Sequence, residues 1–131
     1  MKGVGKSLKA FGAVEKTGIK ANRTVGKAFE RSAIKKLNLN PETAQTRLKQ
    51  VGNMKSYRVA DALDKEGNVV EMKHVKRLRM TDQTRDQFEW ARVSNKKVYF
   101  ACDEGYTQNI DEFSDLLNQE YGGLFGGILG V

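Results

Sequence analysis

Two short Val-rich segments joined by a turn are the feature that most constrains the fold of this chain. They are Tyr57–Leu63 (YRVADAL) and Val69–Val75 (VVEMKHV), and the turn between them is DKEGN, residues 64–68. Each segment has the length and composition of a β-strand. Gly67 suits the left-handed position of a three-residue hairpin loop, so the sequence predicts an antiparallel β-hairpin.

The charged residues of this hairpin do not fit an ordinary buried sheet. Side chains of a strand alternate between its faces, so Glu71 and Lys73 share one face of the second strand. The short loop places Asp61 of the first strand opposite Glu71, unless a bulge shifts the register. Two facing carboxylates destabilise a sheet unless a cation lies between them or both reach water.

Helical patterns precede and follow the hairpin. Apolar residues at helical spacing predict helices over Thr24–Leu37 and Asp111–Tyr121, and a third that starts at Pro41 and ends near Val51. Thr81 is the expected N-cap of a helix through TDQTRDQFEWARV, and VYFAC, residues 98–102, is a further strand. This order predicts an α/β domain with a mixed central sheet flanked by helices.

The two ends of the chain differ in composition from this domain. Residues 1–23 are rich in Gly, Ala and Lys, which favours a basic linker or a frayed amphipathic helix. Residues 122–131, GGLFGGILGV, form an apolar tail that could pack over the core, bind a partner or stay disordered. We therefore expect one domain, residues 24–121, between two ends of different character.

Charge and cysteine content narrow the class of protein. The chain has 23 Lys and Arg against 16 Asp and Glu, a formal net charge of +7, which favours a polyanionic partner. A single Cys, Cys102, forms no internal disulfide, and with a single His, His74, a structural zinc site is not expected. We expect both side chains to be structural, and Phe88 and Trp90 to belong to the core. No apolar run is long enough to span a membrane.

The hairpin acids suit a hard divalent cation. Asp61 and Glu71 supply carboxylates, the ligands that Mg²⁺ and Mn²⁺ prefer. Lys73 could orient a water or stabilise charge on a phosphate. Glu30 falls on the apolar arc of the first helix, either as an edge carboxylate or as an inward functional acid. The alternative is that the strand charges lie on a solvated sheet face.

Asp61, followed ten residues later by Glu71-Met72-Lys73, resembles the PD-(D/E)XK motif of restriction-endonuclease-like nucleases, with Ala60 in place of the proline. The stretch EMKHVKRLRMTDQTRDQFEWA resembles the E-x-K-x-V … L-T-x-Q-x-R-D segment of bacterial polymorphic toxin nucleases, with Met80 at the usual leucine. GKAFERSAIKKLNL resembles their first helix. The resemblance extends from Gly26 to Cys102.

The resemblance implies a restriction-endonuclease-like fold and a metal-dependent nuclease. It places Asp61, Glu71 and the Met72 carbonyl on Mg²⁺ or Mn²⁺ and Lys73 at the attacking water, with the remaining two residues of the site, Glu30 and Gln83, near the metal. The substrate is then a nucleic acid, with DNA favoured over tRNA or other RNA. A phosphate-binding rim is expected from four basic residues: Lys76, Arg77, Arg79 and Arg85.

The resemblance also implies a biological setting. Such domains are C-terminal antibacterial toxins, as in contact-dependent inhibition, carried by larger secreted or cell-surface effectors and active in the target-cell cytoplasm. An acidic cognate immunity protein would then protect the producing cell. Two rival hypotheses are a non-catalytic basic module that binds nucleic acid, and an interaction or membrane-active domain that works through the two ends of the chain.

Overall fold

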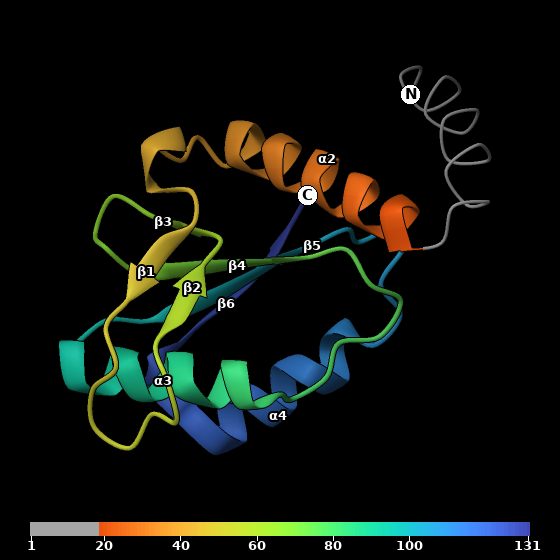
Figure 1. Cartoon of the computed structure of the whole chain (residues 1–131). Helices are drawn as coiled ribbons and strands as arrows, with labels where there is room; N and C mark the ends of the chain where they lie inside the picture. The colour runs from red at the N-terminus through yellow and green to blue at the C-terminus, as the bar shows by residue number, and fades with distance from the viewer. Residues whose placement is uncertain (1–18) are drawn as a thin grey trace.

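The computed structural model describes residues 19–131, which form a mixed sheet with helices on both faces and a two-stranded ribbon beside it (Figure 1). The segment expected as a linker, residues 1–23, lies outside the described residues except for its last five, which begin helix α2. The helices are α2 (Ile19–Lys36), α3 (Asp82–Ser94), α4 (Ile110–Tyr121) and the short 3-10 helices η1 (Pro41–Thr43) and η2 (Gly122–Leu124). The strands are β1 (Thr46–Leu48), β2 (Arg58–Ala60), β3 (Ala62–Leu63), β4 (Val69–Lys73), β5 (Val98–Cys102) and β6 (Phe125–Gly130).

The central sheet has four strands in the order β3-β4-β5-β6. β3 and β4 are antiparallel, while β4, β5 and β6 run parallel, with α3 connecting β4 to β5 and α4 connecting β5 to β6. Figure 1 shows α2 across one face of the sheet and α3 and α4 across the other. The predicted fold class, a mixed central sheet flanked by helices, is confirmed.

The hairpin has the predicted register where its strands pair. Leu63 pairs with Val69, and Gly67 adopts a left-handed conformation with φ of 83°. The predicted first strand, however, is not continuous, because the chain bends at Asp61. The residues before the bend form β2, which leaves the central sheet and pairs with β1 in an antiparallel ribbon. Asp61 therefore lies at the junction of the two sheets.

The helix predicted from Pro41 to Val51 is wrong. Asn40 does cap a helical turn, since its Oδ1 accepts a hydrogen bond from the backbone N–H of Glu42 at 2.9 Å, but η1 is only three residues long. Gln45 then adopts a left-handed conformation, φ 59°, and β1 begins. Pairing with β2 and burial of Leu48, 2% exposed, outweigh the local helix propensity.

Residues 122–131, set apart above as a tail, are part of the fold. They form η2 and then β6, which pairs with β5 at the edge of the sheet. A Cβ placed on Gly126 would meet the Tyr99 ring at 2.4 Å, so glycine is what allows this close approach. Phe125 is buried in the core, which answers the question of where this segment packs.

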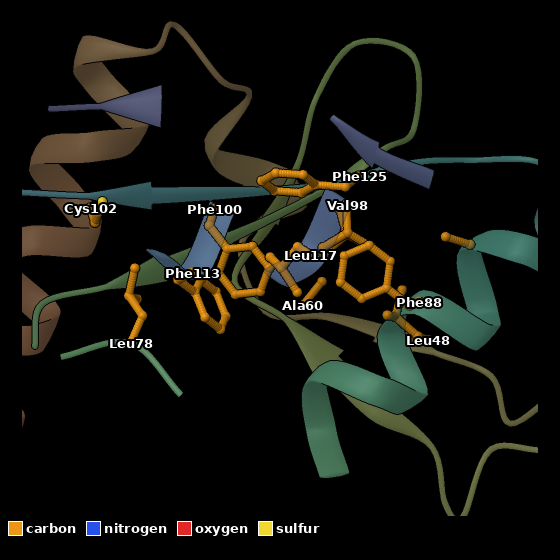
Figure 2. Close-up of a cluster of buried hydrophobic side chains, with 12 residues drawn as sticks. Leu48, Ala60, Leu78, Phe88, Val98, Phe100, Cys102, Phe113, Leu117 and Phe125 are labelled. Atoms are coloured by element: carbon orange, nitrogen blue, oxygen red, sulfur yellow. The ribbon is translucent and has the colours of Figure 1, made fainter. Parts of the chain in front are cut away.

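Two apolar cores hold the layers together. The larger core lies between the sheet and the pair α3 and α4, and Figure 2 shows its aromatic side chains, among them Phe88, Phe100, Phe113 and Phe125. Trp90 packs against this core, as predicted. The smaller core lies between α2 and the opposite face of the sheet, where Ala33 meets Met72. Adjacent residues of β4 thus face different helices.

Helix α3 begins and ends where the sequence indicates. The Thr81 hydroxyl accepts the backbone N–H of Thr84 at 3.1 Å, and Asn95 ends the helix in a left-handed conformation. Asp86 on this helix is 4% exposed and accepts hydrogen bonds from the Lys55 N–H and from Arg58 Nε, at 3.0 and 2.8 Å. This carboxylate therefore anchors the β1-β2 ribbon to α3.

Candidate active site

The bend after β2 brings the two hairpin acids together. The backbone N–H of Asp61 donates a hydrogen bond to Glu71 Oε1 at 3.0 Å, and the N–H of Met72 donates to Asp61 Oδ2 at 2.7 Å. The two acids do not form a strand pair, because the ladder between β3 and β4 ends at Ala62. Each carboxylate instead binds the backbone at or next to the other acid, so their relative position is fixed.

Beyond the last β3-β4 pair, the Asp61 carboxylate accepts the hydrogen bond that a neighbouring strand would otherwise accept from β4. The N–H of Val69 donates to the Lys97 carbonyl at the start of β5. Because backbone polar groups alternate between the two edges of a strand, those of Met72 point the other way, toward Asp61. At that edge of β4 the Met72 N–H donates to the Asp61 carboxylate. The two carboxylates thus lie at the bend, and we expect the Met72 carbonyl at the same edge of β4.

Burial raises the pKa of both acids, and the charge of Asp61 raises that of Glu71 further. Glu71 is 2% exposed, and its pKa is raised to about 7 by burial and by the charge of Asp61, against the opposing effects of Lys73 and of the Asp61 N–H. Burial also raises the pKa of Asp61, while the hydrogen bond from Met72 and the charge of Lys73 lower it. Carboxylates in this condition favour a nearby cation over a second negative charge.

Lys73 and Gln83 lie beside Glu71. Lys73 Nζ is 3.9 Å from Glu71 Oε2, and its side chain is 34% exposed, so the ammonium reaches both the acids and solvent. Gln83, in the first turn of α3, directs its Nε2 to the same oxygen at a long 3.4 Å. The sequence-predicted residues of β4 and α3 therefore meet at one carboxylate.

Glu30 faces the site from α2. Its side chain is half-buried, and its pKa is raised by burial and by the charge of Asp61, while Lys27 and Lys73 oppose the shift. Charge coupling to both Asp61 and Lys73 places Glu30 on the side of α2 that faces the hairpin. A functional role for Glu30 stays a prediction.

Gln87 is a polar residue of this site that the sequence reasoning missed. It is fully buried and lies beside Glu71, close enough to act on its charge. Neither its amide nitrogen nor its amide oxygen makes a hydrogen bond within the described residues. The signal was available, since Gln83 and Gln87 are four residues apart and therefore on one face of α3. A buried amide without a partner is costly, which makes Gln87 a candidate functional residue.

The donor set fits a hard divalent ion. No group of three or more His, Cys, Asp or Glu side chains that could hold a metal occurs within residues 19–131. Mg²⁺ does not need one, because it is commonly held by one or two carboxylates and completes its octahedral shell with waters and substrate phosphates. Asp61, Glu71 and the Met72 carbonyl provide oxygen donors, and the raised pKa values mark negative charge that the protein itself leaves poorly compensated.

The four basic residues predicted for a phosphate rim separate into two groups. Lys76, Arg77 and Arg79 are exposed in the loop that follows Lys73, and Arg77 comes within 3.8 Å of Glu112. Arg85 is two residues after Gln83, about 200° around the helix. It pairs with Asp82 at 3.3 Å and lies near Tyr121 of α4. The structure therefore does not bring Arg85 to the acids.

Two further candidates are structural, as expected. The His74 ring stacks on Tyr106 with centroids 4.5 Å apart and packs against Phe29, on the face of β4 opposite Lys73. Cys102 is fully buried, and burial with the charges of Glu104 and Asp103 raises the pKa of its thiol to about 11. Within residues 25–131 neither residue is hydrogen-bonded or ion-paired to Asp61 or Glu71, and His74 Nε2 lies 3.7 Å from Asp103 Oδ2 instead.

A mixed sheet covered by helices, with two acids and a lysine at the bend of its hairpin, defines the class as the restriction-endonuclease fold. Comparison with protein families agrees: the family model described as restriction endonuclease fold toxin 7 matches residues 26–110. The chain belongs to this family of toxins, which confirms the resemblance found in the sequence. The family description and the fold point to a nuclease.

Other comparisons add nothing to this assignment. Neither the curated proteins nor the solved structures gave a significant match. Within residues 19–131, no helix is both long and apolar enough to span a membrane.

Proposed function

We propose that this chain is a Mg²⁺- or Mn²⁺-dependent endonuclease that hydrolyses phosphodiester bonds of nucleic acid, with DNA favoured over tRNA or other RNA. The observation that carries the proposal is the buried pair Asp61 and Glu71 with Lys73 beside it. A solvated sheet face would not bury Glu71 to 2% exposure or raise its pKa to about 7 by burial and by the charge of Asp61.

Each residue then has a defined role. Asp61, Glu71 and the Met72 carbonyl would hold the ion, which would supply positive charge to polarise the phosphate. Lys73 orients the attacking water and stabilises the negative charge that develops on the phosphate oxygens. Gln83 keeps Glu71 in position by donating to its Oε2. Glu30 accepts hydrogen bonds from waters on the α2 side, and Lys76, Arg77 and Arg79 bind phosphates of the nucleic acid.

The biological role proposed is that of a C-terminal antibacterial toxin domain. A larger secreted or cell-surface effector, as in contact-dependent inhibition, would deliver it, and it would act in the target-cell cytoplasm. The producing cell needs an immunity protein, and a net charge of +7 favours an acidic one whose carboxylates meet the basic loop beside Lys73. Association should then slow steeply with added salt. A basic partner, or tolerance of the active domain without any partner, would contradict this part of the proposal.

The nuclease proposal is tested with plasmid DNA and total RNA. Wild-type protein should degrade nucleic acid in Mg²⁺ or Mn²⁺ and lose this activity in excess chelator, while Asp61→Ala should be inactive in both. Asp115→Ala is a matched control, because it removes an exposed acid on α4 that makes no ion pair within residues 25–131. Degradation that persists in chelator, or in Asp61→Ala, would refute the proposal. The rival, a non-catalytic basic module, predicts binding without cleavage by every variant.

A further inference from the structure

The outer face of the β1-β2 ribbon carries an exposed aromatic residue. Tyr57 is 49% exposed, more than any other large apolar or aromatic side chain of the described residues, and the Arg47 guanidinium lies over its ring, 4.1 Å from the centroid. Neither residue belongs to the site described above. An aromatic ring and an arginine side by side are the groups that single-stranded nucleic acids contact.

This face of the ribbon leads to the acids. Leu48 and Ala60 point inward and are buried, so alternation places Arg47 and Tyr57 on the outward face. Tyr57 directly precedes β2, and Asp61, where the chain bends, directly follows it. Four residues of extended chain span about 13 Å. The backbone of Tyr57 therefore lies within about 13 Å of that of Asp61, close enough for one nucleic-acid strand to contact both.

The ribbon is fixed in place. Asp86 accepts hydrogen bonds from the Lys55 N–H and from Arg58 Nε, and Glu89 accepts the Asn53 N–H at 2.9 Å. These bonds tie both the ribbon and the loop between its strands to α3. A surface held in this way loses little conformational freedom when a ligand binds.

The pair has free binding groups. The guanidinium lies over one face of the Tyr57 ring, and because the residue is still 49% exposed, we infer that the other face is open. Within residues 25–131, the guanidinium N–H groups of Arg47 make no hydrogen bond or ion pair, so they are available to a phosphate. A base can stack on the open ring face, but a base inside a duplex is already stacked on its neighbours.

We propose that Arg47 and Tyr57 form a binding site for an unpaired nucleotide next to the cleaved phosphate. The site makes single-stranded or locally unpaired nucleic acid the substrate class, and DNA and RNA share the chemistry it recognises. This inference rests on the proposed nuclease function, because it takes the acids as the place of cleavage.

Binding is measured by fluorescence anisotropy in excess chelator, which prevents cleavage. The ligands are short oligo-dT and oligo-U strands and a duplex of equal length. Wild type should bind at least one single strand more tightly than the duplex, and comparing oligo-dT with oligo-U distinguishes DNA from RNA. Tyr57→Ala should weaken single-strand binding by about 5- to 100-fold and duplex binding by less than about twofold. Tyr57→Phe, which keeps the ring, should retain wild-type binding.

Leu116→Ala is the matched control, because it trims another exposed apolar side chain, 38% exposed, on α4. Arg47→Ala should weaken the binding of both single strand and duplex, since it removes a phosphate contact. Unchanged single-strand binding in Tyr57→Ala, or an equal loss for strand and duplex, would overturn the inference. If the inference fails in this way but wild type still cleaves nucleic acid in Mg²⁺, the nuclease proposal stands without the nucleotide-binding site. If wild type cleaves nothing, both fail.

Discussion

Replacing Glu71 with Gln should stabilise the metal-free protein at neutral and alkaline pH. The pKa of Glu71 is about 7 against an ordinary value of 4.5, so the folded state holds a proton that the unfolded state releases between these values. The contribution of Glu71 to stability should therefore be greatest below about pH 4.5, fall as the pH rises to about 7, and stay low above it. In the Glu71→Gln variant the side chain at position 71 is uncharged at both pH values, so its contribution to stability does not change between them.

The expected magnitude follows from the same shift. A difference of about 2.5 between 7 and 4.5 corresponds to about 3 to 4 kcal/mol at about 1.4 kcal/mol per pKa unit. This is an upper value, because Asp61 shares the repulsion. Relative to wild type, Glu71→Gln should be about 1 to 3 kcal/mol more stable at pH 8 and nearly equal at pH 4.5.

The assay is urea unfolding in chelator at the two pH values, followed by circular dichroism. Taking the difference between variant and wild type cancels the titration of groups that both proteins share. Glu112→Gln is the control, since it neutralises an exposed acid paired with Arg77 and should change the difference by less than about 0.5 kcal/mol. A Glu71→Gln variant that is no more stable than wild type at pH 8 would refute the reasoning, because burial of an ionised carboxylate would then carry no penalty.

Three further predictions concern residues around the site and the ribbon. Gln87→Met should raise the free energy of unfolding by about 1 kcal/mol, because it removes a buried amide that lacks partners; a loss of stability in thermal unfolding would show that the amide is bound. Leu48→Ala should cost about 2 to 5 kcal/mol in urea unfolding, because β1 packs this side chain into the core; a cost below 1 kcal/mol would favour a solvated helix. Glu30→Gln should weaken Mg²⁺ affinity in calorimetry less than Asp61→Ala does, and an unchanged titration would make Glu30 structural.

Local signals predicted several elements well. The Thr81 cap and the helical spacing of its segment gave α3 its correct start, because the cap hydrogen bond is made within four residues. The turn around Gly67 set the register of Leu63 with Val69 for the same reason. The acids and Lys73 could be identified from spacing and from the resemblance, since the site is built largely within one hairpin.

The features that local signals failed to predict depend on contacts between residues that are far apart in the sequence. Leu48 belongs to a strand because β2, ten residues later, provides the pairing partner and α3 provides the core. The glycine-rich end becomes β6 because β5 offers a free edge and Gly126 fits under the Tyr99 ring. The position of Gln87 beside Glu71 depends on how α3 docks on the sheet. In each case the deciding partner is remote in sequence.

The central claim is that Asp61 and Glu71 hold the metal while Lys73 acts on the water and phosphate. Mg²⁺ binding by calorimetry and cleavage of plasmid DNA and total RNA should be measured together on Asp61→Ala and Lys73→Ala. The account predicts that Asp61→Ala loses both binding and cleavage, whereas Lys73→Ala still binds Mg²⁺ and loses cleavage. Full cleavage by Lys73→Ala, or Mg²⁺ binding by Asp61→Ala equal to that of wild type, would contradict it.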